Sequence, residues 1–221
     1  MTTYYHRVRR DIQPLLPDAA SRILEVGAAA GNTLAWLKTI YPKAHTTGVE
    51  LNAELKAELE NTADVAIFES IEECVTRLQT FDLILLLDVL EHVPDSTRTL
   101  QRVRQLLEPG GRVIVSLPNI AHLSVALPLL TRRRFTYQDA GILDRTHLRF
   151  FVEDTAVKLL NDANLVVTKG LIGGLQGPKS KLLDQLSFGL FRHHLAKQYI
   201  MAGETADGRA SQGRVSWQIA D

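Results

Sequence analysis

An uninterrupted apolar run, FDLILLLD, occupies Phe81–Asp88 and limits the possible folds more than any other stretch. A continuous run of this kind is typical of a central parallel strand that is buried on both faces. Helical patterns separate it from other strand-like runs, and this alternation predicts an α/β fold with a doubly wound, mostly parallel sheet. The expected strands are 23–26, 45–50, 65–68, 81–88, 112–117, 165–171 and 215–220, and the expected helices are 32–40, 53–61, 95–107 and 153–163.

Composition excludes some classes of protein. Lys+Arg and Asp+Glu are both 25 in 221 residues, so the chain lacks the basic field that binding to nucleic acid requires. The single cysteine, Cys74, rules out an intrachain disulfide and fits a reducing compartment. The N-terminus shows no signal-peptide core, and the longest apolar run, Leu83–Leu87, is too short to span a bilayer. We expect a cytoplasmic protein with no membrane span and no nucleic-acid partner.

The stretch ILEVGAAAGN, at 23–32, joins the first strand to the first helix through very small side chains. Gly27 permits a sharp exit from the strand, and Gly31 lets the helix begin close to the sheet. Free N–H groups at a helix N-terminus favour a polar or anionic ligand. A dinucleotide fingerprint would place glycine at Ala29, so this turn differs from that motif. A tight turn without any ligand is the alternative.

Polar side chains are expected where the next strands end. Glu50 could accept hydrogen bonds from the two hydroxyls of a ribose, or it could simply be an acid at a helix N-terminus. After the third strand, Glu69 or Ser70 could reach the exocyclic amine of an adenine, and Ile71 could pack on the base. The carboxyl ends of parallel strands meet at one edge, so these groups predict a nucleoside site there.

Four segments together resemble the class I S-adenosylmethionine-dependent methyltransferases: ILEVGAAAGN, GVELN, FDLILLLDVLEHVPD and LLEPGGRVIVSLPN. The resemblance covers residues 4–172. The segments SLPNIAHLSVALPLL and GILDRTHLRFF are similar to the branch associated with bacterial surface-polysaccharide or glycosyltransferase gene clusters.

The resemblance implies a seven-stranded Rossmann-like sheet whose last strand, 215–220, runs antiparallel beside the fifth. It also implies S-adenosylmethionine as cofactor and S-adenosylhomocysteine as product. Tyr5 and Arg9 would close over the cofactor carboxylate, and Glu50 would hold the ribose. The cofactor-binding set that it implies is Tyr5, Arg9, Glu25, Gly27, Ala28, Ala29, Gly31, Asn32, Glu50, Leu51, Glu69, Ser70, Ile71, Asp88, Val89 and Leu90.

We expect O-methylation of a small or carbohydrate-like acceptor, which needs a base to take the hydroxyl proton. His147 is the first candidate and His92 the second, with Asp144 orienting His147 or pairing with a neighbouring arginine. Either histidine could instead brace its loop. No metal is expected. A non-catalytic S-adenosylmethionine-binding sensor or partner subunit is the main alternative, and a nicotinamide-dependent oxidoreductase is disfavoured by Ala29.

The organisation expected is a single methyltransferase domain over 1–221. The long connection at about 120–151 would form a substrate loop. A helical insert is expected at about 174–212, and its amphipathic segment LLDQLSFGLFRHHL makes a homodimer plausible.

Overall fold

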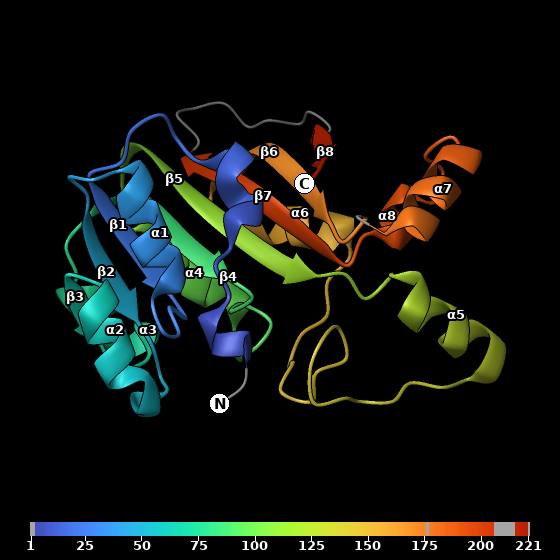
Figure 1. The fold of residues 1–221 in the computed structure, drawn as a ribbon, viewed down its shortest axis with the longest axis horizontal. Helices are drawn as coiled ribbons and strands as arrows, with labels where there is room; N and C mark the ends of the chain where they lie inside the picture. Colours follow the sequence, from blue (N-terminus) through green and yellow to red (C-terminus); the bar gives the residue numbers. More distant parts are fainter. Residues whose placement is uncertain (1–2, 176, 206–214, 221) are drawn as a thin grey trace.

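The computed structural model describes residues 3–175, 177–205 and 215–220, and an eight-stranded sheet forms its centre (Figure 1). The spatial order is β3-β2-β1-β4-β5-β7-β6-β8. Strand β7 pairs antiparallel with both β5 and β6, and the other pairings are parallel. The chain order reverses between β1 and β4, so their carboxyl ends form the crevice where such sheets bind ligands. The strands are β1 Arg22–Val26, β2 His45–Val49, β3 Val65–Ile67, β4 Phe81–Leu87, β5 Leu107–Pro118, β6 Leu165–Gly173, β7 Gln198–Thr205 and β8 Trp217–Ile219.

Strand β4 is buried on both faces, as its continuous apolar run predicts. Ile84 and Leu86 belong to the core that packs under α4 and α6. Leu83 and Leu85 face the opposite core, which packs under α1 and α2. Helices on both faces confirm the doubly wound α/β fold. The helices are α1 Asn32–Ile40, α2 Lys56–Thr62, α3 Ile71–Cys74, α4 Ser96–Arg104, α5 Leu123–Arg132, α6 Glu153–Asp162, α7 Pro178–Leu186 and α8 Arg192–Leu195.

The antiparallel strand beside β5 is not the segment that the sequence predicted. It is β7, Gln198–Thr205, which falls inside the expected helical insert. The segment expected in that place contains β8, an edge strand that runs parallel to β6. The sheet therefore has eight strands, and the helical part of the insert consists of α7 and α8; residues 206–212 of the insert lie outside the described ranges.

The expected substrate loop contains a helix. Helix α5 occupies Leu123–Arg132, and residues 133–152 then run back toward the sheet before α6 begins. Helices α5, α7 and α8 project beyond the same end of the sheet (Figure 1). Within the described ranges, no helix combines the length and apolar character needed to cross a bilayer.

Candidate active site

The turn from β1 into α1 has a backbone that favours very small residues. The φ angle is +71° at Gly27, +49° at Ala29 and +77° at Gly31, all in the left-handed region. A Cβ on Gly27 would lie 2.7 Å from Cγ2 of Val89, and one on Gly31 would lie 1.9 Å from Oγ1 of Thr62 on α2. Packing and backbone conformation therefore explain both glycines, whether or not a ligand binds at this turn. Ala29 adopts a conformation that costs an L-residue about 1–2 kcal/mol.

Glu50, directly after β2, holds this turn against the end of its strand. Its carboxylate accepts hydrogen bonds from the backbone N–H of Ala29 at 2.8 Å, of Leu51 at 2.9 Å and of Asn52 at 2.8 Å. An ionised carboxylate has roughly four acceptor sites. The structure thus orders Glu50 and leaves about one site for a ligand hydroxyl.

A cavity of about 100 Å³ opens beside Glu50 at the carboxyl ends of β1, β2 and β4. Its walls are largely apolar, and Glu50, Glu69, Ser70 and Glu72 supply its polar groups. Most of the lining residues belong to the cofactor-binding set that the resemblance implies. They are Val26, Gly27, Val49, Glu50, Leu51, Glu69, Ser70, Ile71, Glu72, Val89 and Val93.

The two candidates for an adenine amine have different surroundings. The Ser70 hydroxyl donates to Glu73 at 2.8 Å, so its oxygen can still accept a hydrogen bond. The Glu69 carboxylate pairs with Arg77 at an exposed position. Both side chains line the cavity, and the choice between them stays open.

Arg9 lies against the end of β4 rather than open to the cavity. Only 6% of it is exposed. Its Nη1 donates to Asp88 at 2.8 Å and to Ser116 at 3.2 Å, and its Nε and Nη2 donate to Asp11. Four of its five N–H groups are thus engaged, which leaves one for the carboxylate that the resemblance assigns to it. Asp88, with φ of +59°, also accepts a hydrogen bond from the Ser116 hydroxyl at 2.6 Å.

Glu25 is a buried acid on β1, with 3% of its surface exposed. Within the residues that the structure describes, its Oε2 has no hydrogen-bond partner. Burial raises the pKa of Glu25 to about 8, and the opposing effect of Arg9 is smaller. A carboxyl group with an unpaired buried oxygen suits a ligand that brings a positive charge or a donor.

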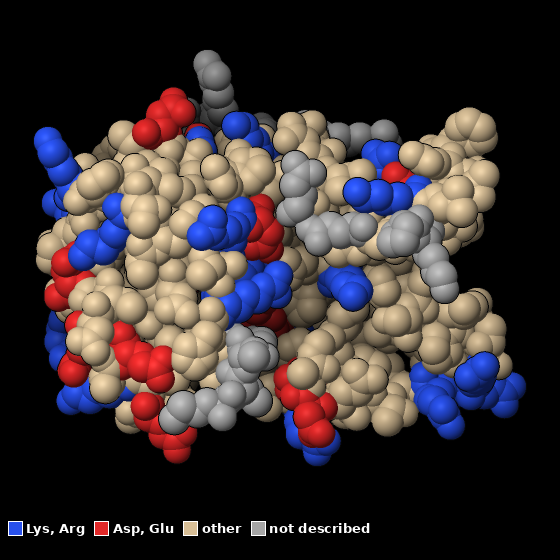
Figure 2. Space-filling view, viewed as in Figure 1, with Lys and Arg blue, Asp and Glu red and all other residues tan. Residues whose placement is uncertain are grey.

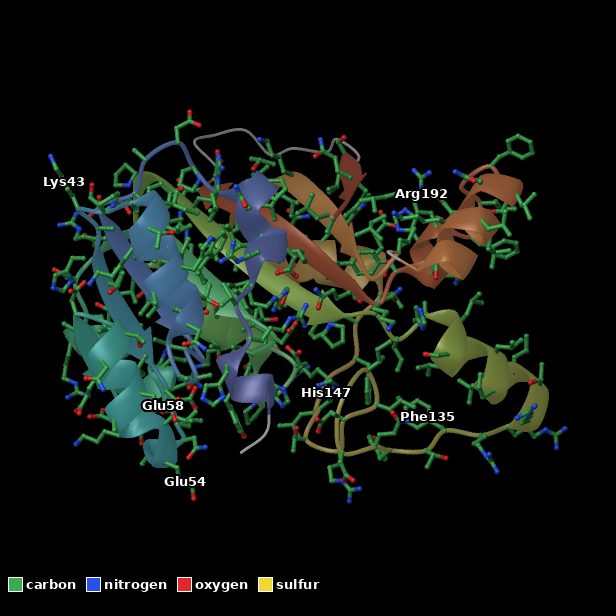
Figure 3. The ribbon with its side chains drawn as sticks, in the orientation of Figure 1. Lys43, Glu54, Glu58, Phe135, His147 and Arg192 are labelled. Atoms are coloured by element: carbon green, nitrogen blue, oxygen red, sulfur yellow. The ribbon has the colours of Figure 1, made fainter. Side chains whose placement is uncertain are left out.

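The histidines expected to act in catalysis lie together. The rings of His92 and His147 meet edge to face with centroids 4.7 Å apart. His147 lies on the connection after α5 (Figure 3). It is 9% exposed, and burial lowers its pKa. Asp144 accepts hydrogen bonds from the backbone N–H and the hydroxyl of Thr146, and that hydroxyl lies 3.0 Å from Nδ1 of His92. Asp144 therefore supports His92 through Thr146. Among the residues that the structure describes, its carboxylate makes no hydrogen bond to His147 and no ion pair with a neighbouring arginine, and Arg145 pairs with Asp139 instead.

Two larger cavities surround these histidines, in the hollow where Figure 2 shows charged side chains of both signs. Glu50 lines both the small cavity and the one of about 550 Å³, and Asp144 lines both larger cavities. The three spaces thus follow one another along the sheet edge. The cavity of about 550 Å³ is lined by Tyr5, Glu50, His92, Asp139, Ala140, Asp144, Arg145 and Thr146. The cavity of about 230 Å³ is lined by Arg7, Asp88, Glu91, Pro118, Gly141, Ile142, Asp144, His147, Lys197 and Gln198.

Other expected residues support the site from behind. Ala28 and Leu90 are packed in the two hydrophobic cores, so their side chains do not line these cavities. The Asn32 amide donates to the carbonyl of His6 and fastens the N-terminal segment. Glu91 had no role assigned from sequence, yet it is 1% exposed and lines the smaller of the two larger cavities. The sequence signal that could have identified Glu91 was its position next to His92, in the loop that follows β4. A cavity of about 840 Å³ between α6 and β8 contains none of the predicted residues.

The known proteins to which this chain is similar are methyltransferases. A model described as a methyltransferase domain matches residues 2–169. The mitochondrial ubiquinone biosynthesis O-methyltransferase of Homo sapiens is 26% identical over 223 residues, which is 90% of this chain and 59% of that protein. The trans-aconitate 2-methyltransferase of Deinococcus radiodurans is 28% identical over 137 residues, covering 60% of this chain and 52% of that protein.

A solved structure supports the fold. A SAM-dependent methyltransferase from Archaeoglobus fulgidus superposes with a TM-score of 0.65 at 13% identity, over 88% of this chain and 91% of that chain. Likeness at this identity concerns the fold alone. The chain spans between about half and three fifths of the curated relatives named above.

Proposed function

The chain belongs to the methyltransferase domain family, and from that premise we propose that it transfers a methyl group from S-adenosylmethionine to a hydroxyl group of a small or carbohydrate-like acceptor. The observation that carries the proposal is the small cavity at the ends of β1, β2 and β4. Apolar residues line it, and Glu50 stands at its rim with an acceptor site to spare.

The residues around this cavity fit an adenosyl group. Val49, Ile71 and Val89 offer apolar surface for a base, and Glu50 offers an acceptor for a ribose hydroxyl. Glu25, buried with an oxygen unpaired in the described part of the chain, suits the amino group of the cofactor. Gly27, whose φ is positive, lines the cavity without a Cβ, so the backbone is open to a ligand there. We infer that cofactor binding uses these groups.

When bound, S-adenosylmethionine supplies a methyl group on a positively charged sulfur, which is a good leaving group. The chain itself must align the acceptor and manage its proton. Alignment can supply roughly 7–11 kcal/mol, and a positioned base typically adds about 10²–10⁴-fold. His147 is neutral near pH 7 because burial lowers its pKa, so it can accept a proton. We assign it the role of base, with His92 beside it and Asp144 positioning His92.

Two observations support the class of acceptor. One relative is named as an O-methyltransferase, which favours oxygen as the methylated atom. The segments after β5 are similar to the branch associated with surface polysaccharides, which favours a sugar-like acceptor. The connection at 133–152 supplies part of the walls of the two larger cavities.

The proposal extends to location and assembly. We propose a cytoplasmic protein, because its only cysteine, Cys74, is free and buried. We also propose a homodimer, because Leu186 is 69% exposed and Phe188 is 100% exposed on the α7 segment. Light scattering after size-exclusion chromatography tests the dimer.

Substitution of Glu50 tests the cofactor site. Each charge-assisted hydrogen bond is worth about 1.5–3 kcal/mol. Loss of the one bond that Glu50 can still accept should therefore weaken binding of S-adenosylhomocysteine to Glu50→Ala by about 10–150-fold in calorimetric titration. Glu50→Gln should give a smaller loss because one oxygen remains. Glu54→Gln is the matched control: Glu54 is exposed and points away from the sheet (Figure 3). Binding by Glu50→Ala with the affinity of the wild type would refute the site.

The acceptor is tested separately with cofactor that carries a labelled methyl group. Nucleotide sugars, lipid-linked glycans and small phenols are offered in turn, and His147→Ala should lower turnover while cofactor affinity stays nearly unchanged. Tight cofactor binding with no transfer to any acceptor would instead favour a non-catalytic sensor.

A further inference from the structure

Glu91, His92 and His147 form a compact cluster, called here the Glu-His-His cluster. One potential ligand atom from each side chain lies within 4.8 Å of the other two. Glu91 and His92 follow β4, whereas His147 comes from the connection after α5. The backbone joins the two segments, because the N–H groups of Leu148 and Arg149 donate to the carbonyl of Glu91 at 2.8 and 3.2 Å. The cluster is therefore part of the folded framework.

The hydrogen bonds of the two imidazoles determine their tautomers. Nδ1 of His147 lies 3.1 Å from the carbonyl of Ile142, which can only accept, so Nδ1 carries the proton. The Thr146 hydroxyl gives its one proton to Asp144 at 2.7 Å, so it can only accept from Nδ1 of His92. Each neutral ring therefore has an unprotonated Nε2 with a free lone pair.

The third member of the cluster is also an acceptor. Glu91 is 1% exposed, and its Oε2 has no hydrogen-bond partner among the residues that the structure describes. The cluster thus offers two imidazole lone pairs and one unpartnered carboxylate oxygen, and one potential ligand atom from each residue lies within 4.8 Å of the others. Such an arrangement is costly unless a cation or a proton satisfies it.

We propose that Glu91, His92 and His147 bind a divalent transition-metal or zinc ion. Two imidazole nitrogens and one carboxylate oxygen are the ligands that zinc and its first-row neighbours prefer, whereas magnesium prefers oxygen alone. Three protein ligands leave at least one coordination position open. This proposal replaces the expectation that the protein binds no metal.

The surroundings of the cluster match those of a metal site. Ligating histidines almost always donate their other ring N–H to a carbonyl or carboxylate, which fixes the ring. His147 does so to Ile142, and His92 does so through Thr146 to Asp144. Glu91 and His147 border one of the two larger cavities and His92 borders the other, so the open position can face an acceptor.

The role of the ion rests on the proposed function. A hydroxyl that approaches a divalent cation loses its proton to water more readily. The ion would thus prepare the acceptor oxygen for methylation in place of His147. The Nε2 lone pair of His147 would bind the ion, so His147 would act as the base only in the metal-free chain. Binding of the ion itself does not depend on this role.

The test uses the full chain, stripped with a chelator and dialysed against a small excess of Co²⁺. Metal content and the visible absorption of Co²⁺ report binding. We expect one ion per chain, and an affinity lowered by more than about 100-fold in Glu91→Gln and in His147→Ala. His45→Ala is the matched control, because His45 is exposed at the opposite ends of the strands. Thermal unfolding without metal confirms that each variant is folded.

Thr146 provides a second, milder test. Thr146→Val removes the nearer of the two acceptors at Nδ1 of His92, the hydroxyl at 3.0 Å, and leaves the Thr146 carbonyl at 3.3 Å. It should weaken Co²⁺ binding by about 10-fold, the lower end of the usual effect of losing such a partner. Thr146→Ser keeps the hydroxyl and should restore affinity. A purely structural role of the threonine would not produce this rescue.

Two outcomes would overturn the proposal. The wild type could retain no Co²⁺, in which case Glu91 carries a proton that it shares with an imidazole, or the substitutions could leave affinity unchanged. Titration of the metal-free chain with S-adenosylhomocysteine separates this proposal from the proposed function. Cofactor binding without Co²⁺ binding would refute the metal site alone, and Co²⁺ binding without cofactor binding would refute the methyltransferase proposal alone.

Discussion

Replacing Glu25 with glutamine tests how the fold accommodates a buried acid beside the glycine turn. Glutamate in an unfolded chain has a pKa of about 4.3, whereas the pKa of Glu25 in the folded chain is about 8 because of burial. Between these values the folded chain keeps a proton that the unfolded chain has lost. The free energy of unfolding therefore falls as pH rises from about 4.3 to about 8, and it levels off above.

The size of this decline follows from the difference between the two pKa values. One pH unit corresponds to about 1.4 kcal/mol, so the decline is on the order of 3–5 kcal/mol. Glu25→Gln cannot ionise, and its stability should not share this decline. The variant should be close to the wild type at pH 5 and more stable by a few kcal/mol at pH 9.

Urea unfolding at pH 5, 6, 7, 8 and 9 measures the effect, with the slope against urea checked for constancy. The difference between variant and wild type is the relevant quantity, because the other titrating groups cancel in it. Glu54→Gln, at an exposed position, should show a difference that does not change with pH. A constant difference for Glu25→Gln would refute the reasoning, because it would mean that Arg9 keeps Glu25 ionised despite burial.

Two further predictions concern the glycines of the turn, and urea unfolding measures both. Gly31→Ala should lower the free energy of unfolding by more than about 3 kcal/mol, because its Cβ would lie 1.9 Å from Oγ1 of Thr62 at a φ of +77°; a loss below about 1 kcal/mol would contradict this. Gly27→Ala should also destabilise, because its Cβ would lie 2.7 Å from Val89. Adding Val89→Ala should remove the clash and leave about 1–2 kcal/mol of backbone strain, so a double variant no better than the single one would show that the clash is not the cause.

The sequence predicted best what depends on local pattern. The run at Phe81–Asp88 was interpreted as a central strand, and β4 indeed places alternate side chains in two cores. Strand β7 was missed because its segment, QYIMAGET, follows an amphipathic stretch and has too few strand signals of its own. Hydrogen bonding to β5 on one side and to β6 on the other stabilises β7 as a strand, although its own sequence does not predict one.

The residues of the candidate site likewise fall into those that local sequence patterns predict and those that depend on contacts distant in sequence. Glu50 and Ile71 were found because they follow strands, and the topology of a parallel sheet brings strand ends together. The pairing of Arg9 with Asp88 was missed, since it joins residues 79 positions apart. Glu91 was given no role, because its burial depends on the later segment that bonds to its carbonyl. Partners so distant in sequence leave no local pattern.

The contact between Leu148 and Glu91 suggests how a widespread fold acquires a specific chemistry. A Rossmann-like sheet can place a nucleoside at its edge for many reactions, so the fold does not define the acceptor. Here residues 141–149 return to the end of β4 and bond to the carbonyl of Glu91, which brings His147 next to His92. The segment that lines the larger cavities is thus fixed to the strand whose end borders the small one. Changes in this connection would therefore alter the acceptor and the histidine pair together, while the cavity beside Glu50 would keep its shape.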